Sequence, residues 1–439
     1  MTTVDAAIQG ELSVNPISHR FVPTDGGIAH EIEIGENAHR SFTPIPADLI
    51  SEDLHGDWWR AYLRGTPTQA PIDAPAVRTV ELFCASGGLA LGFSQACREL
   101  GLQMRSIAAV DQDADAVAIY RRHNDTRLTS TKSVSTLIDY RVRGQDRACR
   151  FLYEPEIVEP KWAELVGQVD AVLAGPPCQG HSNLNNRTRR NDTRNELYLT
   201  APAIAIALRA PIVVIENVAA AVHDKKRVVQ SAQQLLVDAG YEVRSGVLKA
   251  AETGWPQRRD RFFITGRLDR APLDLGAVRS AFAMPPRDLW WAIGDLEDEP
   301  NDGFMTQQAE FSKENVSRIN WLFDNDEHDL ALSERPDCHK DGTTYNSVYG
   351  RLYRNRPAPT ITTGFMTAGR GRYIHPTRRR VLTPHEAARL QGFPDTYNFR
   401  TASGEIPPKS KLAKWIGDAV PMPLGYLAGM AALGPGWKA

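Results

Sequence analysis

From Val77 onward, short apolar and β-branched runs alternate with segments of helical period. The strand candidates are VRTVELF (77–83), RSIAAV (105–110), VDAVLA (169–174), PIVVIEN (211–217), YEVRSGVLK (241–249) and RFFITG (261–266). Helix-like segments lie between them, such as residues 90–100 and 228–240. Strands that alternate with helices in this way predict an α/β fold with a doubly wound, mainly parallel sheet.

The pattern weakens on both sides of this region. Residues 1–75 show no sustained periodicity, and only HGDWWRAYLRG (55–65) is expected to pack as a short helix, so we predict a partly disordered N-terminal extension. The catalytic domain is expected at 76–269. The loop-heavy stretch 270–375 predicts a small second domain. A helix candidate at 383–391 and an apolar segment near 420–433 predict that 376–439 returns to the first domain.

Composition excludes several classes of protein. The 439 residues carry a net charge of −2, so there is no global basic field, although arginines cluster at 187–194 and 369–380. The five cysteines form no CxxC pair, which argues against a metal site or a disulfide framework. No run of about 18 apolar residues and no basic-then-apolar leader is present, so we expect a cytoplasmic protein without a membrane span.

Two turns after strands favour a nucleotide-like cofactor. ELFCASGGLALGFSQA (81–96) places Gly87 and Gly88 between a strand and a helix, where glycine lets the backbone approach a ligand. Asp111 follows the next strand, 23 residues after Gly88. That is close to the offset of about 20 residues at which such sheets place an acid that binds ribose hydroxyls. The alternative for an acid here is a helix N-cap, with Asp113 or Asp115 as rivals.

Candidate chemistry follows three further strands. VLAGPPCQGHS (172–182) puts Cys178 at the carboxyl end of a strand, although taken alone a single cysteine is more often a buried packing residue. Glu216 ends the strand IVVIEN, and a carboxylate there could hydrogen-bond to a base edge. GWPQRRDRFFITG (254–266) presents Gln257, Arg259 and Arg261 at alternate positions, which share one face of a strand.

In this order, these segments resemble the DNA (cytosine-5) methyltransferase family. The resemblance rests on LFCASGG, DQDADAVAIYRRHN, GPPCQGHS, IENV, QRRDR, RVLTPHEAARLQGFP and GDAVP, which together span about residues 78 to 430. It implies a Rossmann-like methyltransferase fold dependent on S-adenosylmethionine, with a target-recognition domain at 270–375. It also implies double-stranded DNA as the substrate, S-adenosylhomocysteine as the product, and no metal.

The resemblance also implies a catalytic role for four residues. Cys178 would attack C6 of a flipped cytosine, and Glu216 would hydrogen-bond N3 and the exocyclic amine. Arg261, assisted by Arg259, would hold the O2 side of the ring.

Further roles follow from the same comparison. The expected cofactor contacts are Phe83, Gly87, Gly88, Asp111, Asp113, Leu197 and Asp418. Residues 180–196 are expected to close over DNA. The expected DNA contacts are Gln179, Ser182, Arg187, Gln257 and Thr360.

The sequence departs from the family pattern at two informative positions. Ala85 stands where the family's FxGxGG turn has its first glycine, a change that we expect to be tolerated if the φ angle there is negative. Asp418 replaces the asparagine of GNAVP and adds a negative charge near the cationic end of the cofactor.

Three other functions remain alternatives at this stage. An RNA methyltransferase of the same fold is disfavoured because the Cys-Phe-Thr segment of that branch is absent. A catalytically idle DNA-binding relative is disfavoured because all catalytic residue types are present, and a Rossmann oxidoreductase because GxGxxG is missing. We expect a monomer, and leave open whether it acts alone or beside a separate restriction endonuclease.

Overall fold

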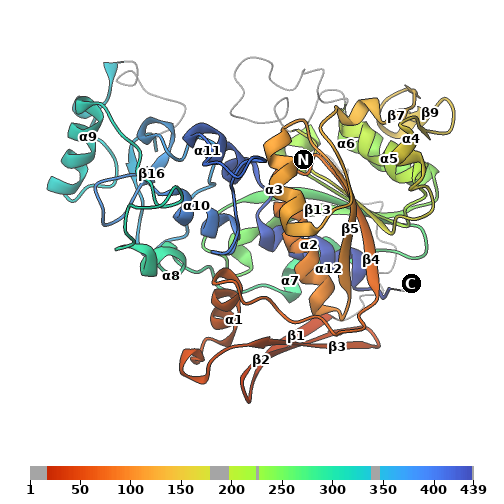
Figure 1. The fold of residues 1–439 in the computed structure, drawn as a ribbon, viewed down its shortest axis with the longest axis horizontal. Helices are drawn as coiled ribbons and strands as arrows, with labels where there is room; N and C mark the ends of the chain where they lie inside the picture. Colours follow the sequence, from red (N-terminus) through yellow and green to blue (C-terminus); the bar gives the residue numbers. More distant parts are fainter. Residues whose placement is uncertain (1–16, 178–196, 224–226, 338–346, 438–439) are drawn as a thin grey trace, which may run out of the picture.

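The computed structural model describes residues 17–177, 197–223, 227–337 and 347–437. Its centre is a seven-stranded sheet of order β13-β14-β12-β11-β4-β5-β6 (Figure 1). The strands are β4 (Ala76–Leu82), β5 (Gln103–Val110), β6 (Leu128–Ser130), β11 (Ala171–Ala174), β12 (Ile212–Val218), β13 (Glu242–Lys249) and β14 (Asp260–Arg267). Neighbours from β6 to β12 pair in parallel, and only β14 runs antiparallel to its neighbours. This arrangement confirms the predicted fold class.

Helices cover both faces of the sheet because successive strand residues point to opposite sides. Leu173 belongs to the core shared with α2 (Gly88–Glu99), α7 (Leu275–Ala281) and α12 (Met422–Leu433). Its neighbour Val172 belongs to the core shared with α5 (Thr200–Ala207) and α6 (Val228–Asp238). Residues 409–433 are apolar and long enough to cross a membrane, but 89% of that window is buried here, as is typical of core helices.

The loop-rich part of the chain lies beside this sheet and has its own core. It contains α8 (Leu289–Ile293), α9 (Lys313–Asp324), β15 (Gly350–Arg351) and β16 (Arg372–Ile374). Its hydrophobic core also includes residues of α10 (Pro384–Gln391), α11 (Lys409–Asp418) and α3 (Ala114–Asn124). The expected borders at 270 and 376 therefore do not coincide with the borders of the cores, since α7 packs with the sheet and α10 with the loop-rich part.

An insertion between β6 and β11 packs on α5 and α6. It consists of two short antiparallel ribbons and a helix, α4 (Pro160–Ala163). One ribbon pairs β7 (Ile138–Asp139) with β10 (Glu156–Ile157), and the other pairs β8 (Val142–Arg143) with β9 (Arg150–Phe151).

The N-terminal region is more ordered than the sequence predicts. Residues 17–44 form an antiparallel sheet of β1 (Ile17–Thr24), β2 (Gly27–Ile34) and β3 (Asn37–Pro44), followed by α1 (Leu54–Leu63) (Figure 1). The short helix expected at 55–65 is present as α1, but the expected lack of order in the residues before it is contradicted by the sheet of 17–44. In β2, Ile28, Ile32 and Ile34 enter the main core. His30 points to the same side and is also buried, and this polar residue interrupts the alternation of apolar and polar positions that would predict a strand.

Glu99 at the end of α2 explains why polar residues can be buried there. The Glu99 side chain is 0% exposed. Its carboxylate lies 2.8 Å from His30 Nδ1 and accepts hydrogen bonds from Thr68 Oγ1 and Gln95 Nε2, both at 2.7 Å, as well as from the Ser41 hydroxyl. The N-terminal sheet is thus fixed to α2 by one saturated acceptor as well as by apolar packing.

Glu99→Ala should therefore destabilise the whole protein by about 3–5 kcal/mol, because it leaves several buried donors without their acceptor. Urea denaturation measures this free energy of unfolding. Glu33→Ala is the control, since Glu33 is an exposed acid of the same sheet. Equal, small effects of the two substitutions would contradict the role assigned to Glu99.

Candidate functional site

The pairing of β11, β12 and β14 brings three sequence motifs to one edge of the sheet. The parallel pairing aligns Ala174 with Ile215, so that Gly175 and Glu216 follow side by side. The antiparallel β14 places Arg261 opposite Val218. The carboxyl end of β12 therefore meets the beginning of β14, where the arginine motif lies.

Glu216 and Arg261 form an ion pair at this edge. Arg261 Nε lies 2.9 Å from Glu216 Oε1, and Glu216 is only 7% exposed. Burial raises the pKa of the Glu216 carboxyl above its usual value, although the charges of Arg261 and Arg259 oppose the shift. The result is a carboxyl group that is more easily protonated than an ordinary glutamate.

The second oxygen of Glu216 faces the Gly-Pro-Pro turn. A Cβ added to Gly175 would lie 3.8 Å from Glu216 Oε2. Asn217 donates from Nδ2 to the carbonyl of Pro176 at 3.4 Å, which holds the turn against the end of β12. Cys178 itself lies outside the described residues, but it is joined to this turn through Pro177.

Arg259 departs from its expected role as a catalytic group. It is 3% exposed, and its guanidinium donates to the carbonyls of Ile361, Gly417 and Ala419. In this conformation Arg259 holds together the loop that follows Thr360 and the junction of α11 and α12. It is a positioning residue that contributes its charge to Glu216 from a distance.

Gln257 also differs from the sequence prediction, which placed it on DNA. It is 0% exposed, donates to the Leu390 carbonyl at 2.7 Å and accepts from the Ile361 backbone at 3.2 Å. Because Gln257 comes before the regular part of β14, its side chain fills the contact between the sheet and α10. The structure therefore corrects the expected DNA contact to an internal one.

The remaining predicted DNA contacts are placed only in part. Thr360 is half-buried, and its hydroxyl donates to the Arg258 carbonyl at 2.8 Å. Gln179, Ser182 and Arg187 lie outside the described residues.

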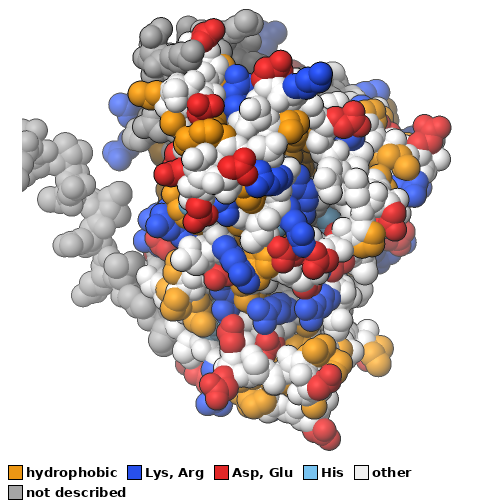
Figure 2. All heavy atoms as spheres, turned by 90° about the vertical axis from the view of Figure 1, so that its left-hand side faces the viewer, with side chains coloured by type: hydrophobic (Ala, Val, Ile, Leu, Met, Phe, Trp, Pro, Cys, Tyr) orange, Lys and Arg blue, Asp and Glu red, His pale blue; other side chains and the backbone are white. Residues whose placement is uncertain are grey.

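Figure 2 shows the face of the loop-rich part, where lysine and arginine side chains gather with acidic ones between them. Several arginines of this part stack on aromatic rings, including Arg354 on Trp290 at 4.2 Å.

The turn after β4 is strained where the sequence lacks its expected glycine. Ala85 has φ +44°, contrary to the negative angle on which its tolerance was expected to depend. Phe83 also has a positive φ, of +56°. Gly87, at φ +89°, uses glycine's freedom as the N-cap of α2. A Cβ on Gly88 would lie 2.3 Å from the Val420 carbonyl oxygen, so the close approach of the Val420 backbone requires a glycine at this position.

Asp111 and Asp113 follow β5 and meet this turn. Asp111 accepts from the Ala85 and Asp113 backbone amides, both at 3.0 Å. A carboxylate offers about four acceptor positions, so two remain for ribose hydroxyls. Asp113 is the N-cap of α3 and also accepts from the Trp415 indole at 2.9 Å. The helix N-cap is therefore Asp113, one of the two expected rivals, and not Asp111. The contact of Asp113 with adenine stays a prediction.

Asp418 ends α11 on the exposed side and pairs with Lys414. Burial lowers the pKa of Lys414, but the charges of Asp418, Asp111 and Asp113 outweigh this and raise it overall. Lys414 thus joins the same charged edge, although its position in the sequence gave no signal for it. Leu197, which is half-buried, comes just before α5, and its cofactor contact also stays a prediction.

These residues fit a sulfonium nucleoside such as S-adenosylmethionine. An aromatic side chain, a glycine turn and an acid with free acceptor positions lie at adjoining strand ends, as a nucleoside with ribose hydroxyls requires. In the described part of the chain, no group of three or more His, Cys, Asp or Glu side chains could hold a metal ion.

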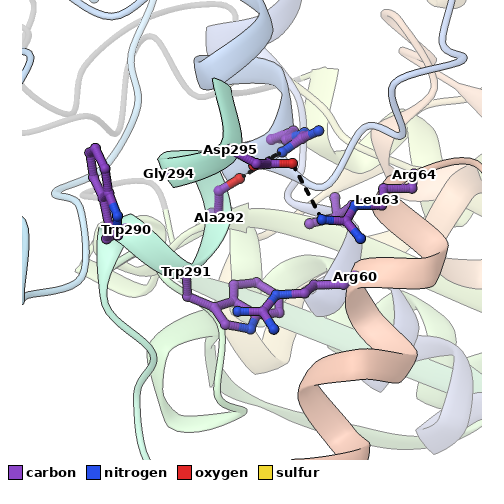
Figure 3. A pocket seen from close by; sticks show the side chains of 9 residues that line it. Arg60, Leu63, Arg64, Trp290, Trp291, Ala292, Gly294 and Asp295 are labelled. Atoms are coloured by element: carbon purple, nitrogen blue, oxygen red, sulfur yellow. Dashed lines mark hydrogen bonds and ion pairs between the residues drawn. The ribbon is translucent and has the colours of Figure 1, made fainter. Parts of the chain in front are cut away.

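A separate cavity lies away from this edge. Its volume is about 220 Å³, and it is lined by Arg60 and Leu63 of α1, by Arg64 directly after α1, and by the segment around Trp291 (Figure 3). Arg64 and Arg389 both pair with Asp295, at 3.5 and 2.6 Å. These arginines are therefore already paired with an acid of the protein. The cavity lies where α1 contacts the loop-rich part.

Comparison with known proteins gives one consistent answer. A model of the C-5 cytosine-specific DNA methylase family matches residues 77–430. The type II methyltransferase M1.BsuMI of Bacillus subtilis is 36% identical over 389 residues, which cover 88% of this chain and 87% of that protein.

Two solved structures share the fold. A DNA modification methyltransferase encoded within an E. coli prophage aligns with a TM-score of 0.52 and 23% identity, over 81% of this chain and 98% of that one. The S. pombe Dnmt2 methyltransferase aligns with a TM-score of 0.54 and 14% identity, over 82% and 99%. At these identities, the two structures establish the fold alone.

A buried acid lies in β4, the strand that leads into the turn of Phe83 to Gly88. Glu81 in β4 is 2% exposed, and burial raises its pKa to about 8, although a hydrogen bond with Tyr120 opposes the shift and the charge of Asp111 adds to it. The folded protein therefore keeps a proton on Glu81 at pH values where the unfolded chain has released it. The free energy of unfolding must fall as pH rises between the two pKa values.

Glu81→Gln should remove this dependence, because glutamine stays neutral. Relative to the Glu81→Gln variant, the wild type should lose about 4 kcal/mol of stability as pH rises from 4.5 to 8. Urea denaturation across that range measures the difference, with the exposed Glu242→Gln as control. Parallel stability curves for wild type and Glu81→Gln would contradict a buried, protonated Glu81.

Proposed function

Because the chain belongs to the C-5 cytosine-specific DNA methylase family, we propose that Cys178, Glu216 and Arg261 carry out its methyl transfer to carbon 5 of cytosine in double-stranded DNA. The observation that supports these roles best is that the two oxygens of the Glu216 carboxyl face different partners. One oxygen is paired with Arg261, and the other faces the turn that leads to Cys178.

Cys178 is the nucleophile in this proposal. Its thiolate forms a bond from Sγ to C6 of the cytosine, and the electron pair of the C5–C6 double bond becomes available at C5. After C5 has gained the methyl group, a base removes the C5 proton, the double bond forms again and the C6–S bond breaks. The thiolate is thereby regenerated, and no electrons are gained or lost overall.

Glu216 supports the attack through its raised pKa. In its protonated form, Glu216 donates to N3 of the ring and accepts from the exocyclic amine, which offsets the negative charge that develops as sulfur adds. Arg261 holds the Glu216 side chain in place and offers its remaining N–H groups to O2. Arg259 fixes the segments around this pair from inside the protein.

S-adenosylmethionine supplies an electrophilic methyl group when bound and leaves as S-adenosylhomocysteine. We assign Phe83 to the adenine ring, Asp111 to the ribose hydroxyls, and Gly87 and Gly88 to the methionine end. Asp113, Leu197 and Asp418 complete the proposed contacts. Lys414 would balance the carboxylates of this charged edge, which otherwise faces a cationic ligand.

A base that reacts with Cys178 cannot remain stacked in a duplex, so the target cytosine must turn out of the helix. Gln179, Ser182, Arg187 and Thr360 are the proposed DNA contacts near it. The name of the Bacillus relative suggests a type II modification role, with a separate endonuclease as partner. We propose that the chain acts in the cytoplasm as a monomer. Methylation of RNA is disfavoured because the family model that matches is described as one of DNA methylases.

Methylation mapping in a methylation-free bacterial host tests this assignment. The wild type should methylate cytosine in one short sequence context, and Cys178→Ala should leave the genome unmethylated. Glu216→Gln should lower kcat by about 10²–10⁴-fold, because it removes the transferable proton but keeps the side chain's shape. Thermal unfolding of each variant confirms that it is folded. Wild-type levels of methylation by folded Cys178→Ala would contradict the proposed nucleophile.

A further inference from the structure

The β8–β9 hairpin carries arginines that have no role in the site described above. β8 and β9 are joined by a turn that includes the 3-10 helix η3 (Asp146–Ala148). Arg143 and Arg147 are both exposed, and among the described residues neither guanidinium has an acidic partner.

The turn of this hairpin contacts the first residues of α6. β12 carries Glu216 near its carboxyl end, at Val218, and η5 (Ala219–His223) and then α6 follow it in the chain. The Asp146 backbone amide donates to Ser231 Oγ in the first turns of α6 at 2.9 Å, and Arg227 lies 3.4 Å from Asp146. β9 and α6 accordingly lie close together in Figure 1.

The insertion carries acids and arginines on different ribbons, except for Asp146 in the hairpin turn, which pairs with Arg227. The acids Asp139, Glu154 and Glu156 are exposed on or beside the β7–β10 ribbon, which packs on α5. The arginines lie on the β8–β9 hairpin, which packs on α6.

The β8–β9 hairpin also pairs two arginines across its strands, which is unfavourable. Arg143 lies directly opposite Arg150 in the strand register, and like charges in that position destabilise a ribbon. Arg150 is compensated by Asp238 at the end of α6, at 2.9 Å. Arg143 has no such compensation among the described residues, so its positive charge is left for a ligand outside the chain.

We propose that Arg143 and Arg147 bind backbone phosphates of the DNA duplex beside the target cytosine. The inference rests on the proposed function, since DNA must lie along the edge that carries Glu216. Arginine is suited to this contact because its planar fork binds phosphate oxygens in pairs. Contacts with phosphates carry no sequence information, so the hairpin adds affinity and fixes the duplex, while base recognition is left to other parts of the protein.

A double charge reversal tests this surface. R143E/R147E and wild type are compared in binding to a nonspecific duplex of about 40 base pairs at a series of salt concentrations. The slope of log K against log salt should become shallower by about 1.8, for two lost phosphate contacts, and affinity should fall at least about 10-fold. The matched control is Arg209→Glu, an exposed arginine that precedes β12 at the opposite edge of the sheet.

Activity separates this contact from the catalytic assignment. On a duplex that contains the target, R143E/R147E should raise KM for DNA and leave kcat unchanged. Equal binding by R143E/R147E and Arg209→Glu would overturn the proposal, as would a loss of kcat or of thermal stability in the double variant. If the wild type binds duplexes but methylates none, the proposed function fails while the salt series still decides the role of the hairpin.

Discussion

The candidate site depends on the register of three neighbouring strands. β11 and β12 end together, so the Gly-Pro-Pro turn stands beside Glu216, and the reversal of β14 returns Arg261 to the same place. A shift of one residue in either pairing would turn Glu216 or Arg261 to the other face of the sheet. The ion pair between them, at 2.9 Å, is the visible result of this register.

Much of the remaining structure keeps these strand ends in position. Arg259 and Gln257, which the sequence motif alone assigns to the ligand, instead hold the chain segments near Ile361 and Ala419 from inside. The N-terminal sheet adds a second support, because Glu99 anchors it to α2, the helix that begins at Gly88. Buried polar groups therefore stabilise two regions. Arg259 and Gln257 hold the segments next to the candidate site, and Glu99 holds the N-terminal sheet against α2.

The sequence predicts the sheet well because its strands are continuous apolar runs, and it predicts the order of the motifs because each follows such a strand. It fails where local pattern and tertiary packing disagree. His30 and its buried acceptor Glu99 are 69 positions apart, so no local period reveals that β2 enters the core. The period of two places Gln257, Arg259 and Arg261 on one face, but only Arg261 lies within the regular strand and reaches Glu216. Ala85 adopts a positive φ that only neighbours distant in sequence, such as Asp111, explain.

The central claim is that the turn beside Glu216 delivers Cys178 to carbon 6 of cytosine. The most direct measurement uses a duplex with 5-fluorocytosine at the methylated position, because fluorine cannot leave as a cation and the C6–S bond then persists after methyl transfer. We predict a covalent complex of protein and DNA by intact mass, with the bond mapped to Cys178 and absent in Cys178→Ala. An enzyme that methylates normal DNA yet forms no such complex, or forms it at another residue, would contradict the claim.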